Sequence, residues 1–194
     1  MLFQLTPSAM PEGYGEALLP LAECKAWLSI DSGATEFDAL IGVIRDAAID
    51  GVEKYVNQFM GPRTGVVATF VGFAAGGSAM RLGRGPEASV VVTAIDYLDA
   101  DGVADAIDAG GWRWTVNGLV PATGTRWPVG GSEVRVTFDA GYAANACPPA
   151  LKTAGLMFVG HLFANREALI EGGLRGDLPA GVMWWCNLVR MPVL

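Results

Sequence analysis

The spacing of hydrophobic residues predicts two long helices separated by a run of short strands. Residues 36–60 carry apolar side chains at helical spacing, directly after the capping residue Thr35. Gly61-Pro62 then ends the pattern, because glycine favours a helix C-cap and proline cannot continue a helix. The second long helix is expected over residues 148–168, where nearly every side is apolar.

Between these helices the pattern changes to short segments of β-forming residues, punctuated by glycine and proline. We expect strands over residues 66–73, 80–82, 90–98, 103–107, 112–116 and 133–138. The Asp-Gly pair within residues 99–102 predicts a tight hairpin, because its residues tolerate positive φ values. A short amphipathic helix over 21–30 and a last apolar segment over 179–194 complete the pattern.

The apolar helix over 148–168 is expected to be surrounded by protein on all sides. Hydrophobic residues make up 52% of the 194 residues and charged residues only 17%. We therefore expect more apolar surface than one folded copy can cover, and identical neighbouring copies that cover the rest.

Charge and length exclude several classes of protein. The formal net charge of −7 and the absence of a Lys/Arg cluster argue against a protein that grips nucleic-acid phosphates. An acidic surface would instead let DNA slide past without sticking. The longest charge-free stretch, 65–80, is too short for a membrane helix, and 1–12 does not read as a secretion signal. Cytoplasmic synthesis without a membrane partner is the expectation.

Few residues suggest bound cofactors or metals, and none are expected. Cys24, Cys147 and Cys186 are far apart and read as reduced, mostly buried thiols. The glycines of 83–88 precede a strand rather than the helix that a dinucleotide site requires. The single histidine, His161, is expected to be partly buried and structural.

A group of aspartates around the predicted hairpin offers the only basis for an enzyme. These residues are Asp96, Asp99, Asp101, Asp105 and Asp108. Paired-carboxylate chemistry requires two carboxylates held across a cleft, and proximity around a hairpin does not provide this. A small-molecule enzyme is therefore the least favoured reading.

The C-terminal segment concentrates aromatic and flexible side chains that commonly carry interface energy. Candidate interface residues are Met183, Trp184, Trp185, Arg190 and Leu194. The competing interpretation is a last helix that packs on the core of its own chain.

Several segments together resemble the head-tail connector (adaptor) proteins of long-tailed phages. They are 21–28, 36–41 leading to 52–55, 99–102, 134–142, 149–152 and 161–167, in the order that this family uses. Each segment alone is generic, and their order over about residues 18–190 supplies the specificity. The Trp184-Trp185 pair departs from the Leu-rich ending of that family.

The resemblance implies an α+β fold in which a helical bundle carries an inserted β-rich subdomain. Residues 1–194 would form a single adaptor domain, helical over 18–62 and 147–194, with the β-rich insertion over 64–141. Copies would form a dodecameric ring beneath the capsid portal, in the neck of a virion or phage-like particle. The ring would bind the portal and a stopper or tail-terminator protein, and DNA would pass through its lumen.

The same resemblance covers gene transfer agents, which are phage-derived particles made by bacteria, and the sequence does not separate the two. No catalysis is expected. The alternative is a neck stopper or tail-terminator ring protein. Such proteins are mostly β, so a large helical content would favour the adaptor.

Overall fold

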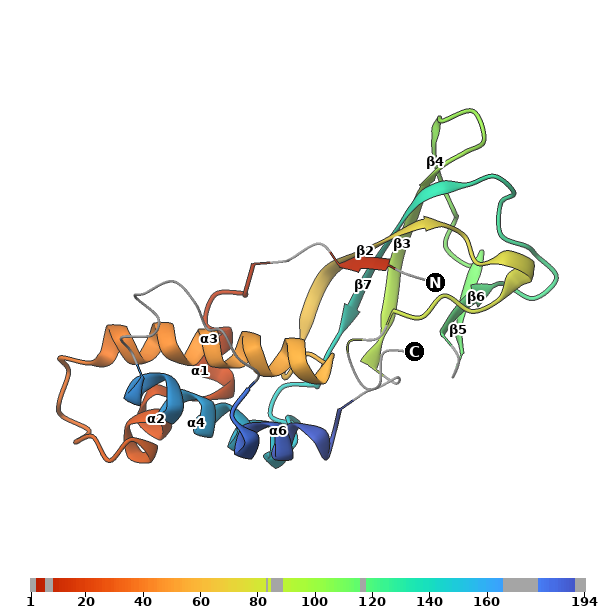
Figure 1. The fold of residues 1–194 in the computed structure, drawn as a ribbon. Helices are drawn as coiled ribbons and strands as arrows, with labels where there is room; N and C mark the ends of the chain where they lie inside the picture. Colours follow the sequence, from red (N-terminus) through yellow and green to blue (C-terminus); the bar gives the residue numbers. More distant parts are fainter. Residues whose placement is uncertain are drawn as a thin grey trace. The chain divides into compact units, whose positions relative to one another are not determined.

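A computed structural model describes residues 3–5, 9–82, 84, 89–115, 118–165 and 178–190 (Figure 1). The chain forms two compact units, each described here by itself. The β unit consists of Met1–Ala9 and Pro62–Gly141, and the helical unit of Met10–Gly61 and Tyr142–Leu194. Helices and strands are both abundant, which confirms the expected α+β class.

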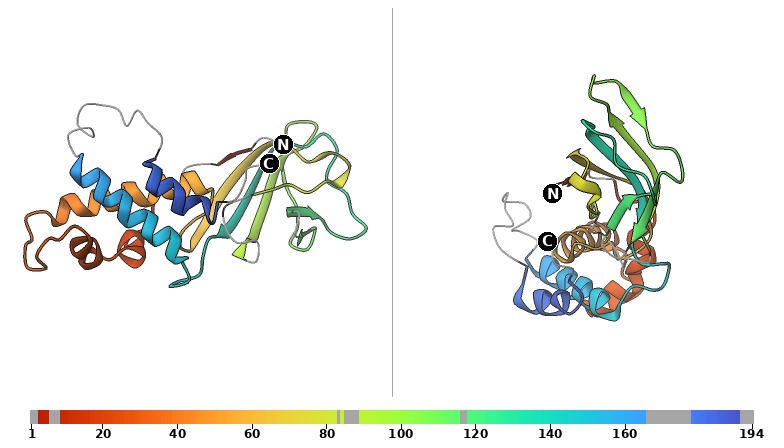
Figure 2. Two further views of the ribbon diagram at one scale, coloured as in Figure 1. Left: turned by 60° about the horizontal axis from the view of Figure 1, so that its bottom comes forward. Right: turned by 90° about the vertical axis from the view of Figure 1, so that its right-hand side faces the viewer.

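The helical unit is built around two long helices with shorter helices packed against them (Figures 1 and 2). Its elements are α1 (Tyr14–Leu18), α2 (Leu21–Trp27), α3 (Asp38–Val56), α4 (Pro149–Ala164) and α6 (Ala180–Asn187). The long helices expected over 36–60 and from residue 148 onward are therefore present. α3 ends earlier than predicted because Asn57 takes a left-handed conformation, with φ of 58°, and its N–H bonds to the Glu53 carbonyl.

The core of the helical unit lies where α4 packs against α3, α6 and α2. The buried side of α3 carries branched residues one turn apart, among them Ile41, Ile44 and Val52. From α4 the core receives Leu151, Ala154, Gly155, Leu156, Phe158, Val159 and Leu162. Gly155 allows the close packing of α4 against Leu19, because a Cβ there would stand 2.8 Å from Leu19 Cδ1 and the leucine would have to shift.

Helices of the same chain cover most of α4, and the expectation that identical copies cover the remaining apolar surface stays a prediction. The buried residues of α4 are enclosed by helices of the same chain, since α2, α3 and α6 pack around it. The helix reads as apolar on every side because it lies between several helices of one unit. Large exposed apolar side chains of this unit lie elsewhere, at Trp27, Val43, Trp184 and Leu188.

The β unit contains an antiparallel five-stranded sheet with the order β1-β2-β7-β3-β4. Its strands are β1 (Phe3–Leu5), β2 (Arg63–Gly72), β3 (Val91–Leu98), β4 (Ala104–Ala106) and β7 (Ser132–Ala140). The central strand β7 alternates, with Val134, Val136 and Phe138 buried on one face. This alternation follows from the period of two in a strand and gives the sheet its core face.

The predicted hairpin at 99–102 is confirmed. The Asp99 carboxylate accepts hydrogen bonds from the N–H groups of Asp101 (2.9 Å) and Val103 (2.8 Å). Gly102 takes φ of 78°, which glycine adopts without steric cost. The turn thus connects β3 directly to β4.

A separate two-stranded ribbon pairs β5 (Trp112–Thr115) with β6 (Gly118–Pro121). The strand expected over 80–82 is present only as an isolated bridge between Met80 and Leu119. The predicted loop at Gly83 and 85–88 lies outside the described residues, as does Val116. In the described part of the chain, no helix has the length and apolar character needed to cross a bilayer.

Candidate protein interface

The C-terminal helix α6 packs on its own unit with one side and presents the other to solvent. Val182 and Cys186 are buried, Met183 and Trp185 are half-buried, and Trp184 is exposed. The interpretation as a helix that packs on its own core is therefore confirmed for one side of α6, and the interface interpretation of the exposed side stays a prediction. Arg190 is also exposed, and Leu194 lies outside the described residues.

Polar contacts fix the end of this segment against α3. Tyr55 donates a hydrogen bond of 3.1 Å from its hydroxyl to Asn187 Oδ1, and the Arg190 guanidinium lies 4.5 Å from the centre of the Tyr55 ring. The Gln58 side chain donates to the Val189 carbonyl. These contacts hold the segment in one position, so its exposed side chains are presented on a defined surface.

Packing within α6 sets the direction of its tryptophans. The rings of Trp184 and Trp185 meet edge to face, with centroids 4.8 Å apart and planes at 84°. At the start of the helix, Gly181 allows a close approach to α4, since a Cβ there would stand 2.7 Å from Met157 Cε. α6 therefore lies against α4, as the two blue helices of Figure 2 show.

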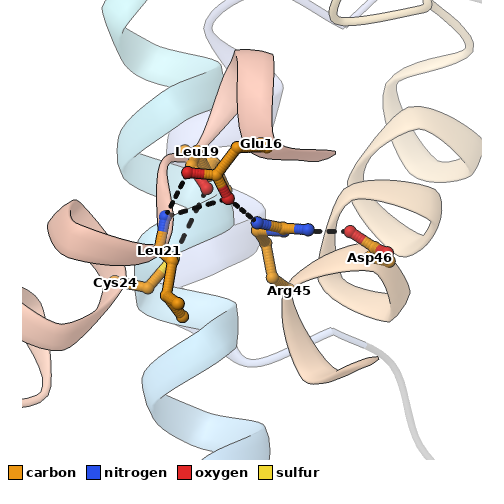
Figure 3. A network of polar contacts seen from close by, with 6 residues as sticks. All are labelled: Glu16, Leu19, Leu21, Cys24, Arg45 and Asp46. Carbon is orange, nitrogen blue, oxygen red and sulfur yellow. Dashed lines mark hydrogen bonds and ion pairs between the residues drawn. The ribbon is translucent and has the colours of Figure 1, made fainter. Parts of the chain in front are cut away.

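A polar network positions the short helix α2 beside the long ones (Figure 3). The Glu16 carboxylate accepts the Leu21 N–H at 3.1 and 3.2 Å, which caps the first turn of α2. Arg45 of α3 pairs with Glu16 and reaches Asp46 Oδ1 at 2.9 Å. The Arg45 side chain is nearly buried and joins α3 to α1 through its ion pair with Glu16, which in turn accepts the Leu21 N–H of α2.

The expectation for His161 is wrong, because its side chain is exposed rather than partly buried. The His161 side chain lies beside Asn165, whose Nδ2 is 3.5 Å from Nδ1, and beside the Phe158 ring. The described residues contain no group of three or more His, Cys, Asp or Glu side chains able to hold a metal ion.

The three cysteines are free and buried, as expected. Burial raises the pKa of each thiol, Cys24, Cys147 and Cys186, from 9.0 to about 11. They are therefore protonated at neutral pH and poor nucleophiles.

The aspartate group lines part of an open hollow of about 530 Å³ in the β unit, to which Asp96, Asp105, Glu133 and Arg135 contribute. Tyr97 donates a hydrogen bond of 2.6 Å from its hydroxyl to Asp105 Oδ2. This bond raises the pKa of Tyr97 to about 12 and lowers the pKa of Asp105. Tyr97 therefore stays protonated and Asp105 stays ionised at neutral pH. A general acid or base instead needs a pKa near the working pH.

Asp99 serves the chain itself. Asp99 is occupied by the turn that it caps, so it does not face a second carboxylate across a cleft. Tyr97 was missed from the sequence, because its role depends on a strand pairing that places it opposite Asp105.

No protein-family model and no curated protein matches the sequence. Solved structures do match, over 100% of this chain and 98% of the other chain in each case. One is from the neck of an empty gene transfer agent (GTA) particle computed with C6 symmetry, with 26% identity and a TM-score of 0.69. Another is from the virion of a native GTA particle, with 25% identity and a TM-score of 0.67. A third, with 25% identity and a TM-score of 0.65, is from the neck of a native GTA particle computed with C12 symmetry.

The fold of this chain is that of a structural protein of a particle neck. The resemblance drawn from the sequence is confirmed: the solved structures that this chain resembles over its whole length are components of gene transfer agent particles, two of them from the neck.

Proposed function

We propose that this chain is the adaptor subunit of a head-tail connector. Twelve copies would form a ring beneath the capsid portal of a gene transfer agent or phage particle, in line with the C12 symmetry of one similar neck. The ring joins head to tail, and DNA leaves through its lumen without sequence-specific binding. Synthesis takes place in the cytoplasm of the bacterial host, and the chain performs no catalysis.

The observation that carries this proposal is the similarity over the whole length of both chains to proteins of GTA necks. The two units would act together as one adaptor domain. The helical content supports an adaptor over a stopper or tail terminator, because those ring proteins are mostly β. Here α3 has 19 residues and α4 has 16.

The C-terminal segment is proposed to take part in assembly through Met183, Trp184, Trp185 and Arg190, continued by Leu194. Trp184 and Arg190 are exposed, and the segment is held in place by Tyr55 and Gln58. Exposed aromatic and arginine side chains on a fixed surface are typical of interface anchors.

Deletion of the chain from the producing cells tests the proposal. Electron micrographs should then show separate heads and tails, and expression of the chain from a second site should restore joined particles. Filled, tailed and infectious particles without the chain would overturn the assignment.

Binding to purified portal separates the adaptor from the alternative ring proteins. An adaptor binds the portal directly. A stopper or terminator binds only after an adaptor is present, so association that depends on a third protein would favour that alternative.

A further inference from the structure

Three distant parts of the chain meet at the side chain of Gln58, just after the end of α3. Gln58 is buried, with only 3% of its surface exposed. Its Nε2 donates to the Val189 carbonyl of the C-terminal segment, and its Oε1 accepts the Tyr142 hydroxyl at 2.7 Å. Val189 lies 131 positions from Gln58 in the sequence, and Tyr142 lies 84 positions away. The amide therefore joins the C-terminal segment to a part of the chain that is far from it in sequence.

The partners of the Gln58 amide fix its orientation. The Val189 carbonyl can only accept a hydrogen bond, so the amide nitrogen must face it. The amide oxygen then faces Tyr142, whose hydroxyl must act as the donor. The opposite orientation would place two acceptors, the amide oxygen and the Val189 carbonyl oxygen, against each other. Both bonds therefore depend on one orientation of one side chain.

The backbone on both sides of the bond between Tyr142 and Gln58 is also held in place. The Gln58 N–H bonds to the Glu53 carbonyl of α3 at 3.3 Å. Tyr142 is the first residue of the helical unit after the β unit, and its N–H bonds to the Phe59 carbonyl at 3.4 Å. The returning chain thus lies beside the end of α3, where its hydroxyl reaches the amide.

The bond from Gln58 ends on the part of the C-terminal segment that carries exposed side chains. Val189 lies between Leu188, which is 56% exposed, and Arg190, which is also exposed. The Val189 N–H bonds back to the Cys186 carbonyl at 3.1 Å. The hydrogen exchange of this N–H therefore indicates whether the segment keeps its place at the end of α6.

We infer that Tyr142 positions the C-terminal segment for assembly by acting through Gln58, although Tyr142 is not one of the candidate interface residues. A hydroxyl that donates to an amide oxygen polarises the amide and strengthens the hydrogen bond that the amide nitrogen donates. Without this hydroxyl, the amide loses the partner that holds its orientation, and its bond to Val189 weakens. The inference rests on the proposed function and adds to it a positioning residue outside the candidate interface.

Hydrogen exchange of the full-length chain tests the positioning, with the Val189 N–H as the reporter. Tyr142→Phe should speed this exchange about two- to tenfold, the range expected for one hydrogen bond. Gln58→Met should speed it at least as much, because it removes the bond to Val189 itself. In the Gln58→Met background, Tyr142→Phe should have no further effect, since the two side chains act as one connection.

Lys25→Met is the matched control, because it breaks an ion pair with Asp38 at the start of α3 and lowers the stability of the same unit. It should leave the exchange of Val189 unchanged. Equal effects of Lys25→Met and Tyr142→Phe would mean that any loss of stability releases the segment, and would overturn the inference. So would normal exchange of Val189 in Tyr142→Phe, or an effect of Tyr142→Phe that is the same with and without Gln58.

Incorporation into particle necks tests the consequence for assembly. Gln58→Met combined with Tyr55→Phe removes the two side-chain hydrogen bonds that hold the segment. The amount of this double variant per portal in purified particles should fall about twofold or more, because fewer copies present the segment in its binding position. Lys25→Met, if folded, should incorporate normally. Normal incorporation of the double variant would overturn the role in assembly. The deletion experiment would still decide the adaptor function, because it does not depend on how the segment is held.

Discussion

The Tyr14 hydroxyl donates a hydrogen bond of 2.5 Å to Glu53 Oε1, joining residues 39 positions apart in the sequence. Both side chains are buried. The same hydroxyl accepts the Gly61 N–H at 2.8 Å, and Glu53 Oε1 accepts the Met60 N–H at 2.8 Å. A buried carboxylate thus finds its partners in α1 and in the segment that follows α3.

Tyr14→Phe should destabilise the helical unit by about 1–3 kcal/mol, because it removes a partner from a buried carboxylate and from a backbone N–H. Urea unfolding followed by circular dichroism measures the change. Tyr55→Phe is the matched control, since its bond to Asn187 is exposed and should contribute about 0.5 kcal/mol or less. Equal losses in the two variants would contradict this account.

Lys25 holds the loop before α3, and its side chain is only 6% exposed. Its ammonium lies 2.5 Å from Asp38 Oδ1 and donates to the Ala34 carbonyl at 2.7 Å. Lys25→Met should cost about 2–4 kcal/mol, because it leaves a partly buried carboxylate and a carbonyl without their cation. Thermal unfolding is the measurement. Lys54→Met breaks an exposed pair with Asp50 and should change stability by less than about 0.5 kcal/mol.

The buried thiols predict that the free energy of unfolding decreases at alkaline pH. Burial raises the pKa of Cys24, Cys147 and Cys186 from 9.0 to about 11, so an unfolded thiol ionises at lower pH than a folded one. Their contribution to stability is therefore complete below pH 9.0 and is lost as the pH rises to about 11.

Two measurements test this. The urea concentration at the midpoint of unfolding should decrease as the pH rises from 9 to about 11. At pH 8, alkylation by iodoacetamide should be slow for the native chain and fast in denaturing urea. Rapid labelling of the folded chain at pH 8 would show that the thiols are accessible.

Substitutions in the hairpin distinguish a structural role of its aspartates from a catalytic one. Asp99→Ala should destabilise the β unit by about 1 kcal/mol, because two backbone N–H groups lose their acceptor. Asp101→Ala should change its stability by less than about 0.5 kcal/mol. Particles made with either variant should join heads to tails normally. Under the enzyme hypothesis, the double variant would instead lose function while remaining folded.

The long elements could be predicted because their patterns are regular over many residues. α3 presents Ile41, Ile44 and Val52 at helical spacing, and β7 alternates through Val134 and Phe138. The end of α3 was placed too late, because the apolar spacing continues to Phe59 while the backbone turns at Asn57. That turn depends on the tertiary contacts of Glu53, which no local pattern contains.

Short elements were missed because tertiary contacts stabilise them. α1 has five residues, and its Tyr14 and Leu18 are buried against the rest of the helical unit. β1 has three residues and pairs with β2, 65 or so positions later in the chain. Propensity alone does not identify elements of this length.

The composition of the C-terminal segment predicts a candidate interface, and the structure shows which of its side chains are exposed. The aromatic segment indicated both Trp184 and Trp185, and only the packing of α6 on α4 shows which of them is exposed.

The residues on either side of the β unit lie close together. Arg63 and Ala140 are partners at the end of the β2–β7 ladder, and in the helical unit the Tyr142 N–H bonds to the Phe59 carbonyl at 3.4 Å. The inserted segment of the β unit therefore begins and ends at neighbouring points. A segment whose two ends lie close together can change in length or sequence while the rest of the chain keeps its fold. The β unit can thus acquire new contact surfaces in the course of evolution.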